Sequence, residues 1–251
     1  MIAVNTVRTF SRLGLLLAAI IFGMLLAAYS TVALAAEVVA RVDAIAGPVT
    51  VISADGAVRQ LRKGSEIVAG DTIDTAVNGR VRLLFSDNGR VFVRPSSRFV
   101  IDSYHYSGDK QLDKSHFSLV KGGFRAITGA IGKGNHEKVR INTPVATIGI
   151  RGTDHEARYC NGDCRDFIAD DGREPADGLY TGTNAGCTFT GGLEFGAGQY
   201  GYTAVGRQTS RLADPPAILV NDSELRGALG TLHPAVYIPA QPRSVTSVPC
   251  R

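Results

Sequence analysis

Apolar and polar residues alternate with a period of two from Val38 onward, and glycine interrupts the pattern at short intervals. Within residues 80–85, for example, Val81, Leu83 and Phe85 share one face of the segment. A period of two is typical of strands that are buried on one side and solvated on the other. The pattern therefore predicts an all-β protein of short antiparallel strands and hairpins, arranged either as a β-sandwich or as a short β-solenoid.

Turn-forming residues separate the expected strands. Asn78-Gly79 lies between two of them and is typical of a type I′ hairpin, because both residues tolerate positive φ angles. Pro144 interrupts another apolar segment, and since proline has no backbone N–H to donate, we expect a bend there. The expected strands cover residues 38–45, 49–52, 71–77, 80–85, 90–94, 99–106, 117–120, 139–150 and 194–205.

The chain changes character beyond Cys160. A stretch rich in Gly, Asp and Thr runs to about Gly192 and predicts a long loop, and the proline-rich tail from Pro234 predicts an extended segment. Between them, Asp222 is placed to cap a short helix over residues 224–229, because its carboxylate can accept from backbone N–H groups. The sequence thus predicts a leader at 1–35, a β domain at 36–158, and a Gly- and Cys-rich C-terminal extension at 159–251 with further strands.

The N-terminus has the order of a secretion signal. Arg8 and Arg12 precede the uncharged apolar run 13–28, and the small residues of 33–35 form a cleavage site that leaves Ala36 as the new N-terminus. We therefore expect export to the periplasm, with no membrane span after cleavage. The alternative is an uncleaved inner-membrane anchor, because the run with its flank reaches roughly 17 residues.

The charge balance is nearly neutral once the leader is removed. Loss of Arg8 and Arg12 leaves 25 basic residues against 23 acidic ones, an excess of two. No lysine-rich stripe with interleaved aromatic residues occurs in the sequence. The composition therefore gives no electrostatic indication of a nucleic-acid partner.

Four cysteines, all in the C-terminal part of the chain, indicate disulfides. An even number of cysteines in an exported protein favours bridges, and four cysteines allow three pairings. A local bridge between Cys160 and Cys164 encloses a turn-like tripeptide and leaves Cys187 and Cys250 as the second pair. The alternative is a zinc site, because a Cys-x3-Cys spacing is permitted, although no histidine stands at a companion spacing.

Several short motifs follow one another between Arg41 and Asp154, and the strongest is the run TPVATIGIRGT at 143–153. Together they resemble the FecR-type domain, a periplasmic β module of iron-uptake regulators and other exported proteins. The resemblance implies a compact all-β module without a known active site. The other matching features are Gly47 with alternating valines, the Leu61–Gly64 step, Gly70-Asp71-Thr72-Ile73 with Thr75, Leu83–Phe85 with Asp87, and Pro95-Ser96-Ser97.

The best-understood members of that family sense an outer-membrane receptor and control a sigma factor. In those regulators an anti-sigma domain precedes a transmembrane helix. Only twelve residues precede the apolar run in this chain, which are too few for a folded domain. We therefore expect a stand-alone exported relative rather than a direct regulator of a sigma factor.

Most residues of the matching motifs are expected to be structural. Gly149 and Gly152 permit a close approach of the backbone, and threonine suits strands. Arg151 is the exception, because a guanidinium among small residues either satisfies buried carbonyls or binds a carboxylate or phosphate. The motif positions with this mainly structural expectation are Gly70, Asp71, Thr143, Pro144, Gly149, Arg151, Gly152 and Thr153.

Asp154-His155-Glu156 contains the residue types of a catalytic or metal-binding cluster. In a strand, Asp154 and Glu156 face one way and His155 the other, so the three side chains do not converge. Two carboxylates on one face leave calcium binding or acid–base chemistry as an alternative that needs further ligands.

Tyr104 and Tyr106 are expected to share a strand face with Asp102, either as part of the core or as a platform for stacking on a sugar. The candidate binding residues are therefore Arg151, Asp154, His155, Tyr104 and Tyr106.

No catalytic residue, metal ion or cofactor is predicted. The Gly-rich run 129–134 lacks the spacing and the hydroxyl of a phosphate-binding loop. The sequence also contains no Gly-x-Ser-x-Gly nucleophile elbow.

Three functions fit these observations. The first is a non-enzymatic periplasmic module that binds or scaffolds an envelope protein or glycan through strand edges and loops. The second is an accessory in cell-surface signalling of the iron-uptake type. The third is a metal-dependent hydrolase. The sequence does not specify the partner or the oligomeric state.

Overall fold

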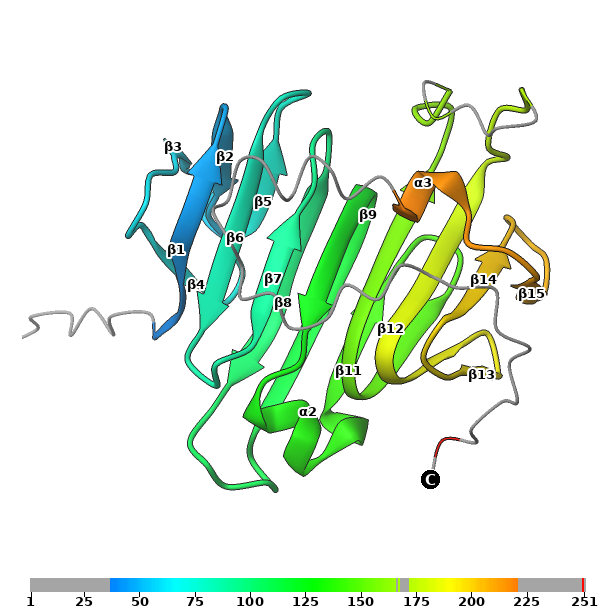
Figure 1. Ribbon diagram of the computed structural model, residues 1–251. Coiled ribbons are helices and arrows are strands. Elements are labelled where there is room, and N and C mark those ends of the chain that lie inside the picture. Colours follow the sequence, from blue (N-terminus) through cyan, green and yellow to red (C-terminus); the bar gives the residue numbers. More distant parts are fainter. Residues whose placement is uncertain (1–36, 166, 168–171, 221–249, 251) are drawn as a thin grey trace, which may run out of the picture. The chain divides into compact units, whose positions relative to one another are not determined.

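The computed structural model describes residues 37–165, 167, 172–220 and 250, which form strands with three short helical segments (Figure 1). The strands are β1 (Val38–Ala46), β2 (Val49–Ile52), β3 (Val58–Gln60), β4 (Glu66–Val68), β5 (Thr72–Thr75), β6 (Arg80–Phe85), β7 (Arg90–Val93), β8 (Arg98–His105), β9 (Lys114–Ile127), β10 (Val139–Asn142), β11 (Thr147–Cys160), β12 (Gly178–Thr190), β13 (Leu193–Phe195), β14 (Gln199–Thr203) and β15 (Ser210–Leu212). The helical segments are α2 (Ala130–Gly134), the 3-10 helix η1 (His136–Lys138) and α3 (Ala217–Val220).

All the strands belong to one open, mixed sheet with two arms that meet at β9. One arm runs β4-β1-β6-β7, the other runs β3-β2-β5-β8, and both β7 and β8 pair with β9. Beyond β9 the sheet continues through β10, β11, β12, β14 and β15, with β13 paired to β12. The β9–β10 pairing is parallel and the other pairings are antiparallel.

The arms pack face to face and enclose the main core. The first layer contains β4, β1, β6, β7, β14 and β15, and the second contains β3, β2, β5, β8, β10 and β13. The long strands β9, β11 and β12 contribute one half to each layer. Phe85 of the first layer contacts Tyr104 and Phe117 of the second, with ring centroids 5.1 and 5.3 Å apart. The all-β prediction is confirmed, and the face-to-face packing is that of a sandwich.

Glycines with positive φ lie where the three long strands pass from one layer to the other. Gly122 of β9 has φ +74°, and a Cβ there would lie 2.2 Å from the Ser97 Oγ. Gly186 of β12 has φ +73°, and a Cβ there would lie 2.3 Å from the carbonyl oxygen of Gly152. Both crossings therefore require glycine, because any side chain would be strained and would clash.

Two strand predictions are corrected by the structure. The segment 139–150 is not one bent strand but the hairpin of β10 and β11, whose turn is closed by the Thr143 hydroxyl donating to the Ala146 carbonyl at 2.7 Å. Pro144 lies in that turn, where a missing N–H costs nothing. The long loop expected beyond Cys160 contains all of β12, whose many glycines and threonines are not typical of a strand that is largely buried.

The C-terminal region carries the expected bridges and a short helix. Disulfides join Cys160 to Cys164 and Cys187 to Cys250, so no thiolate remains for the alternative zinc site among the described residues. The short helix near the C-terminus is α3, whereas the expected helix at 224–229, the leader at 1–35 and most of the tail lie outside the described residues. The boundary at 158/159 stays a prediction, and β11 crosses it.

No helix within the described ranges is long and apolar enough to cross a membrane.

Candidate functional site

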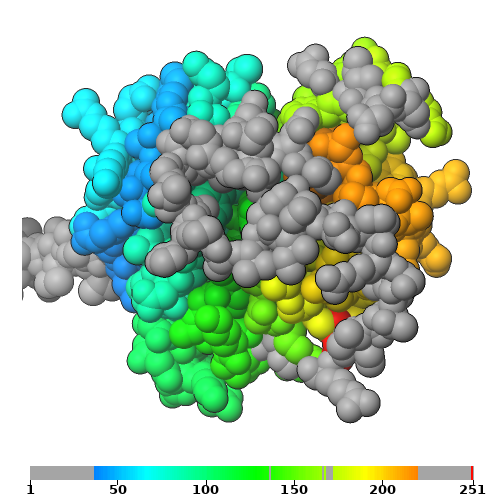
Figure 2. Space-filling model, in the orientation of Figure 1, coloured from blue at the N-terminus to red at the C-terminus, as the bar shows by residue number. Residues whose placement is uncertain are grey.

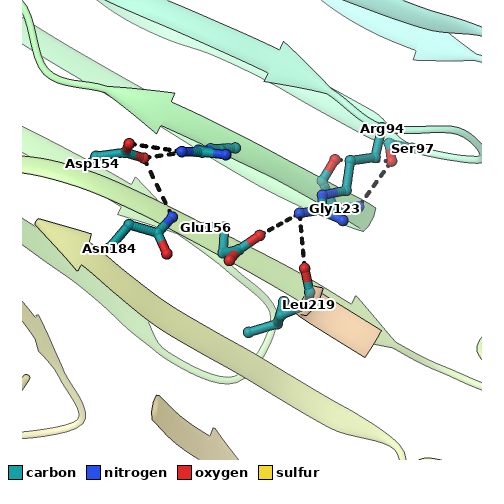
Figure 3. Close-up of polar contacts among 8 residues, drawn as sticks. Arg94, Ser97, Gly123, Asp154, Glu156, Asn184 and Leu219 are labelled. Carbon is teal, nitrogen blue, oxygen red and sulfur yellow. Dashed lines mark hydrogen bonds and ion pairs between the residues drawn. The ribbon is translucent and has the colours of Figure 1, made fainter. Parts of the chain in front are cut away.

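One buried and one partly buried ion pair lie on the outer surface of the first layer (Figure 3). Arg94 follows β7 and pairs with Glu156 of β11, and both side chains are only 8% exposed. The same guanidinium donates to the carbonyl oxygen of Leu219 in α3 at 3.4 Å. Arg94 therefore connects the sheet to the C-terminal helix, which packs against β11 and β12 (Figure 2).

A second ion pair lies beside the first. The Arg125 guanidinium of β9 donates from Nε and Nη2 to the two carboxylate oxygens of Asp154, at 2.9 and 2.8 Å. The Asn184 amide of β12 also donates to Asp154, at 3.4 Å. We call Arg94, Arg125, Asp154, Glu156 and Asn184 the first-layer network. Its carboxylates are occupied by neighbouring arginines, which leaves them poorly placed to bind a metal ion.

A small apolar cluster lies at the end of this surface. It consists of the Cys160–Cys164 disulfide, Tyr180, Ile218 and Leu219, and Arg158 stacks nearby on Phe167 at 4.2 Å. The Tyr180 hydroxyl donates to the carbonyl oxygen of Ala176 at 3.0 Å, and burial raises the pKa of Tyr180 to about 12. The cluster anchors the C-terminal segment to the sheet rather than presenting a reactive group.

The motif Pro95-Ser96-Ser97 holds β8 against the bend of β9 (Figure 3). The Gly123 N–H donates to the Ser97 Oγ at 2.8 Å, and the Ser97 N–H donates to the Thr75 hydroxyl at 2.8 Å. The Thr75 hydroxyl in turn donates to the carbonyl oxygen of Arg94 at 2.6 Å. These contacts join the two layers beside the first-layer network, so this motif is structural.

A small, partly open cavity of about 40 Å³ lies between the layers, and Asp87, Tyr104 and His155 are among its lining residues. The Asp87 carboxylate accepts from the N–H groups of Gly89 at 2.9 Å and Ile131 at 3.2 Å, and so caps the start of α2. The Tyr104 hydroxyl accepts from the Asp87 N–H at 3.1 Å, and burial raises the pKa of Tyr104 above its ordinary value.

His155 is more deeply buried than Asp87 and Tyr104, the other two ionisable residues named above. Its Nδ1 lies 3.0 Å from the Thr153 hydroxyl, its ring meets Phe124 edge-on, and its Nε2 has no hydrogen-bond partner within the described part of the chain. Burial lowers the pKa of His155 to about 4, so the ring is neutral at pH 7. A cavity of this size admits water rather than a substrate.

The structure brings together only two of the five candidate binding residues. Tyr104 and His155 line the same cavity, whereas Asp154 lies on the first layer. Arg151 lies in the half of β11 that belongs to the second layer, with its guanidinium 5.6 Å from the Phe189 ring centroid. Tyr106 lies just beyond β8, partly buried against the main core.

A bulge in β8 corrects the expectation that Asp102 and Tyr104 share a face. The pairing of β8 with β9 shifts between Ile101 and Ser103, so Ile101 and Tyr104 both face the core and Asp102 is exposed. The extra residue of a bulge reverses the alternation that the sequence implies.

The remaining motif residues lie at turns and junctions. Gly70 has φ +91°, and the fully buried Asp71 accepts from the Val68 N–H at 3.0 Å and from Arg59 at 3.5 Å. The Thr153 N–H donates to the Thr128 hydroxyl at 3.0 Å.

Of the first-layer network, the sequence indicated only the carboxylates Asp154 and Glu156 on one strand face, not the residues that pair with them. Arg94 and Glu156 stand 62 positions apart, and no local spacing in the sequence connects them.

Residues 71–165 match the family model described as FecR protein. This match confirms the resemblance indicated by the sequence motifs and includes every residue of the first-layer network except Asn184. No curated protein matches the chain.

Solved structures give only distant similarities. A cell surface anchoring domain is 31% identical over 25% of this chain and 82% of its own, with a TM-score of 0.24. A protein from Parabacteroides distasonis described as an anti-sigma factor is 7% identical over 58% of this chain, with a TM-score of 0.41, and the chain spans 60% of that protein's length. A second structure of that protein gives 8% identity and the same TM-score and coverage.

Proposed function

Because residues 71–165 form a FecR domain, we propose that this protein acts in cell-surface signalling, as a periplasmic accessory that senses an envelope partner and relays its state to a separate regulator. The match to the FecR family is the observation that carries this proposal. The two disulfides also support it, because such bonds persist in an oxidising compartment.

The geometry supports recognition rather than catalysis. Asp154 and Glu156 are engaged by arginines, and His155 is buried beside a cavity that is too small for a substrate. None of these three residues is positioned as a nucleophile or as an accessible general base. A partner would therefore be recognised by surfaces and strand edges.

The open sheet has strand edges that suit a second function, binding or scaffolding of an envelope protein. β3 and β4 end the two arms, and all three residues of β3 are exposed, with Val58 at 66%. An exposed edge can accept a strand from another protein through main-chain hydrogen bonds. Binding of this kind is compatible with signalling but does not require it.

A deletion strain tests the signalling role. Transcription would be compared under iron limitation in the parent, in the deletion strain, and in that strain carrying the gene again. We expect a defined set of uptake genes to lose induction in the deletion strain and to regain it on complementation. Unchanged transcription together with capture of an envelope protein in a crosslinking pull-down would reject the signalling role in favour of the scaffold.

A further inference from the structure

Four basic residues form a ladder on the outer surface of the second layer. Lys114 and His116 belong to β9, Lys138 ends η1, and Arg140 belongs to β10. The parallel pairing places Arg140 beside His116. Alternate residues of both strands, including Ser115, Phe117, Val139 and Ile141, are buried. Lys114, His116 and Arg140 therefore point outward together. Lys138 is half-buried and lies close enough to act on His116, and we call these four residues the cation ladder.

The two lysines and the arginine of the ladder form no ion pair within the described part of the chain, although the Asp102 carboxylate lies close enough to act on His116. Lys114 and Arg140 are exposed, and among the described residues neither they nor Lys138 lies within ion-pair distance of a carboxylate. This arrangement differs from the first-layer network, where Arg94 and Arg125 pair with Glu156 and Asp154.

The positive charges of the ladder act on the pKa of the His116 imidazole. Burial lowers the pKa of His116, and Arg140, Lys114 and Lys138 lower it further, while Asp102 acts in the opposite sense. The Asp102 carboxylate also accepts a hydrogen bond from the Ser118 hydroxyl at 2.7 Å. Arg140, Lys114 and Lys138 therefore all lie close enough to His116 to stabilise an anion bound next to its imidazole.

An open hollow of about 540 Å³ adjoins the ladder, and Lys114 lines both. Its size is that of a site for a small molecule. Asp102, Ser103 and His105 supply polar groups, and Leu112 supplies an apolar one. On the other side of the ladder, Arg140 pairs with Gly149, and the Phe189 side chain lies 3.7 Å from where a Cβ of Gly149 would be.

We propose that the cation ladder and the adjoining hollow bind a phosphorylated sugar. A phosphate monoester carries a charge of about −1.5 to −2 at pH 7, which suits several cations better than a single carboxylate does. Arg140 offers a guanidinium fork for phosphate oxygens, and His116 and the lysines offer further donors. Asp102 and Ser103 line the hollow, where their side chains would form hydrogen bonds with sugar hydroxyls. This binding goes beyond the signalling role and does not depend on it.

Titration of His116 by NMR in the full mature chain tests the site, with glucose 6-phosphate as the probe and glucose and inorganic phosphate for comparison. The His116 signal is identified by its loss in His116→Asn. We expect glucose 6-phosphate to raise the pKa of His116, because the bound dianion stabilises the imidazolium, and glucose to leave it unchanged. Added salt should weaken the binding.

Two variants and a control locate the binding. Arg140→Gln and Lys138→Gln should each weaken the affinity for glucose 6-phosphate by about three- to tenfold. Lys63→Gln removes an exposed lysine from a distant turn and should leave the affinity unchanged. Circular dichroism checks that each variant is folded.

Three results would overturn the proposal. One is a His116 pKa that does not respond to glucose 6-phosphate, and another is an unchanged affinity in both ladder variants. The third is equal affinity for inorganic phosphate and glucose 6-phosphate, which would show that the hollow does not contribute to binding. Vesicles of phosphatidylcholine with and without phosphatidic acid test whether the site binds the phosphate of a lipid headgroup instead of a free sugar phosphate. Capture by the acidic vesicles alone, without binding of the free sugar phosphate, would likewise reject the site as described.

Discussion

Two groups of basic residues, the first-layer network and the cation ladder, lie on the outer surfaces of the two layers and differ in whether carboxylates pair with them. On the first layer, Arg94 and Arg125 meet Glu156 and Asp154, and α3 covers part of the pairing. On the second layer, Lys114, Lys138 and Arg140 of the cation ladder form no ion pair with a carboxylate among the described residues, and Lys114 and Arg140 are exposed. Charge that is paired and buried stabilises a fold, whereas charge left unpaired at a surface is free to act on a ligand. The difference separates structural arginines from candidate binding ones.

The largest effect is expected from breaking the buried pair of the first layer. Glu156→Gln leaves the Arg94 guanidinium buried without a countercharge, so the free energy of unfolding should fall by about 3–5 kcal/mol. Urea denaturation followed by circular dichroism measures this loss. Glu66→Gln is the matched control, because the Arg41–Glu66 pair is more than half exposed and should contribute less than about 1 kcal/mol. Equal losses in the two variants would contradict the distinction between buried and exposed pairs.

The two disulfides should stabilise to different extents. Cys187 and Cys250 are 63 positions apart, whereas Cys160 and Cys164 are separated by four. By loop-closure entropy, replacing the long-range pair with serines should cost about 4 kcal/mol, and replacing the local pair about 2 kcal/mol. Thermal unfolding of the two double variants measures both losses. A larger loss from the local pair would show that its packing in the small apolar cluster, rather than chain entropy, dominates.

His155 should make the stability of the core depend on pH. Its pKa is about 4 in the folded protein and about 6.5 when unfolded, so between these values the unfolded chain binds a proton that the folded chain does not. The contribution is fully present above pH 6.5 and is lost as the pH falls to 4, a change of about 3 kcal/mol.

Urea denaturation at several pH values measures the His155 contribution, with His155→Gln as the comparison. The variant should show a shallower fall in stability across this range, because glutamine does not titrate. An identical slope in the two proteins would show that other groups cause the dependence.

Local patterns in the sequence were enough to predict most strands of the residues that match the FecR model, the positions of several glycine turns and the two disulfides. The type I′ turn expected at Asn78-Gly79 is wrong, because neither residue has a positive φ. Local patterns were not enough where long-range pairing decides the outcome. The bulge at Asp102 is set by the register of β8 against β9, and β12 is a strand because it lies between β11 and β14. The Arg94–Glu156 pair depends in the same way on β7 and β11 both flanking β9. No local propensity encodes such neighbours.

The smallest effect on stability is expected from removing one charge of the cation ladder. Arg140→Gln removes a charge from the cation ladder that has no carboxylate to lose among the described residues, so the free energy of unfolding should change by less than about 0.5 kcal/mol. Relief of repulsion from Lys114 and Lys138 would make the change slightly favourable. Arg125→Gln, which breaks the two-bond contact with Asp154, should cost about 1–3 kcal/mol.

Urea denaturation of the two variants, side by side at low and at high salt, makes this measurement. A substantial loss of unfolding free energy in Arg140→Gln would mean that this arginine stabilises the sheet. That result would contradict its role as a residue that serves a ligand rather than the fold. A near-zero change would instead mark Arg140 as a residue that the fold does not require. Any effect of the same variant on sugar phosphate binding could then be assigned to the ligand contact itself.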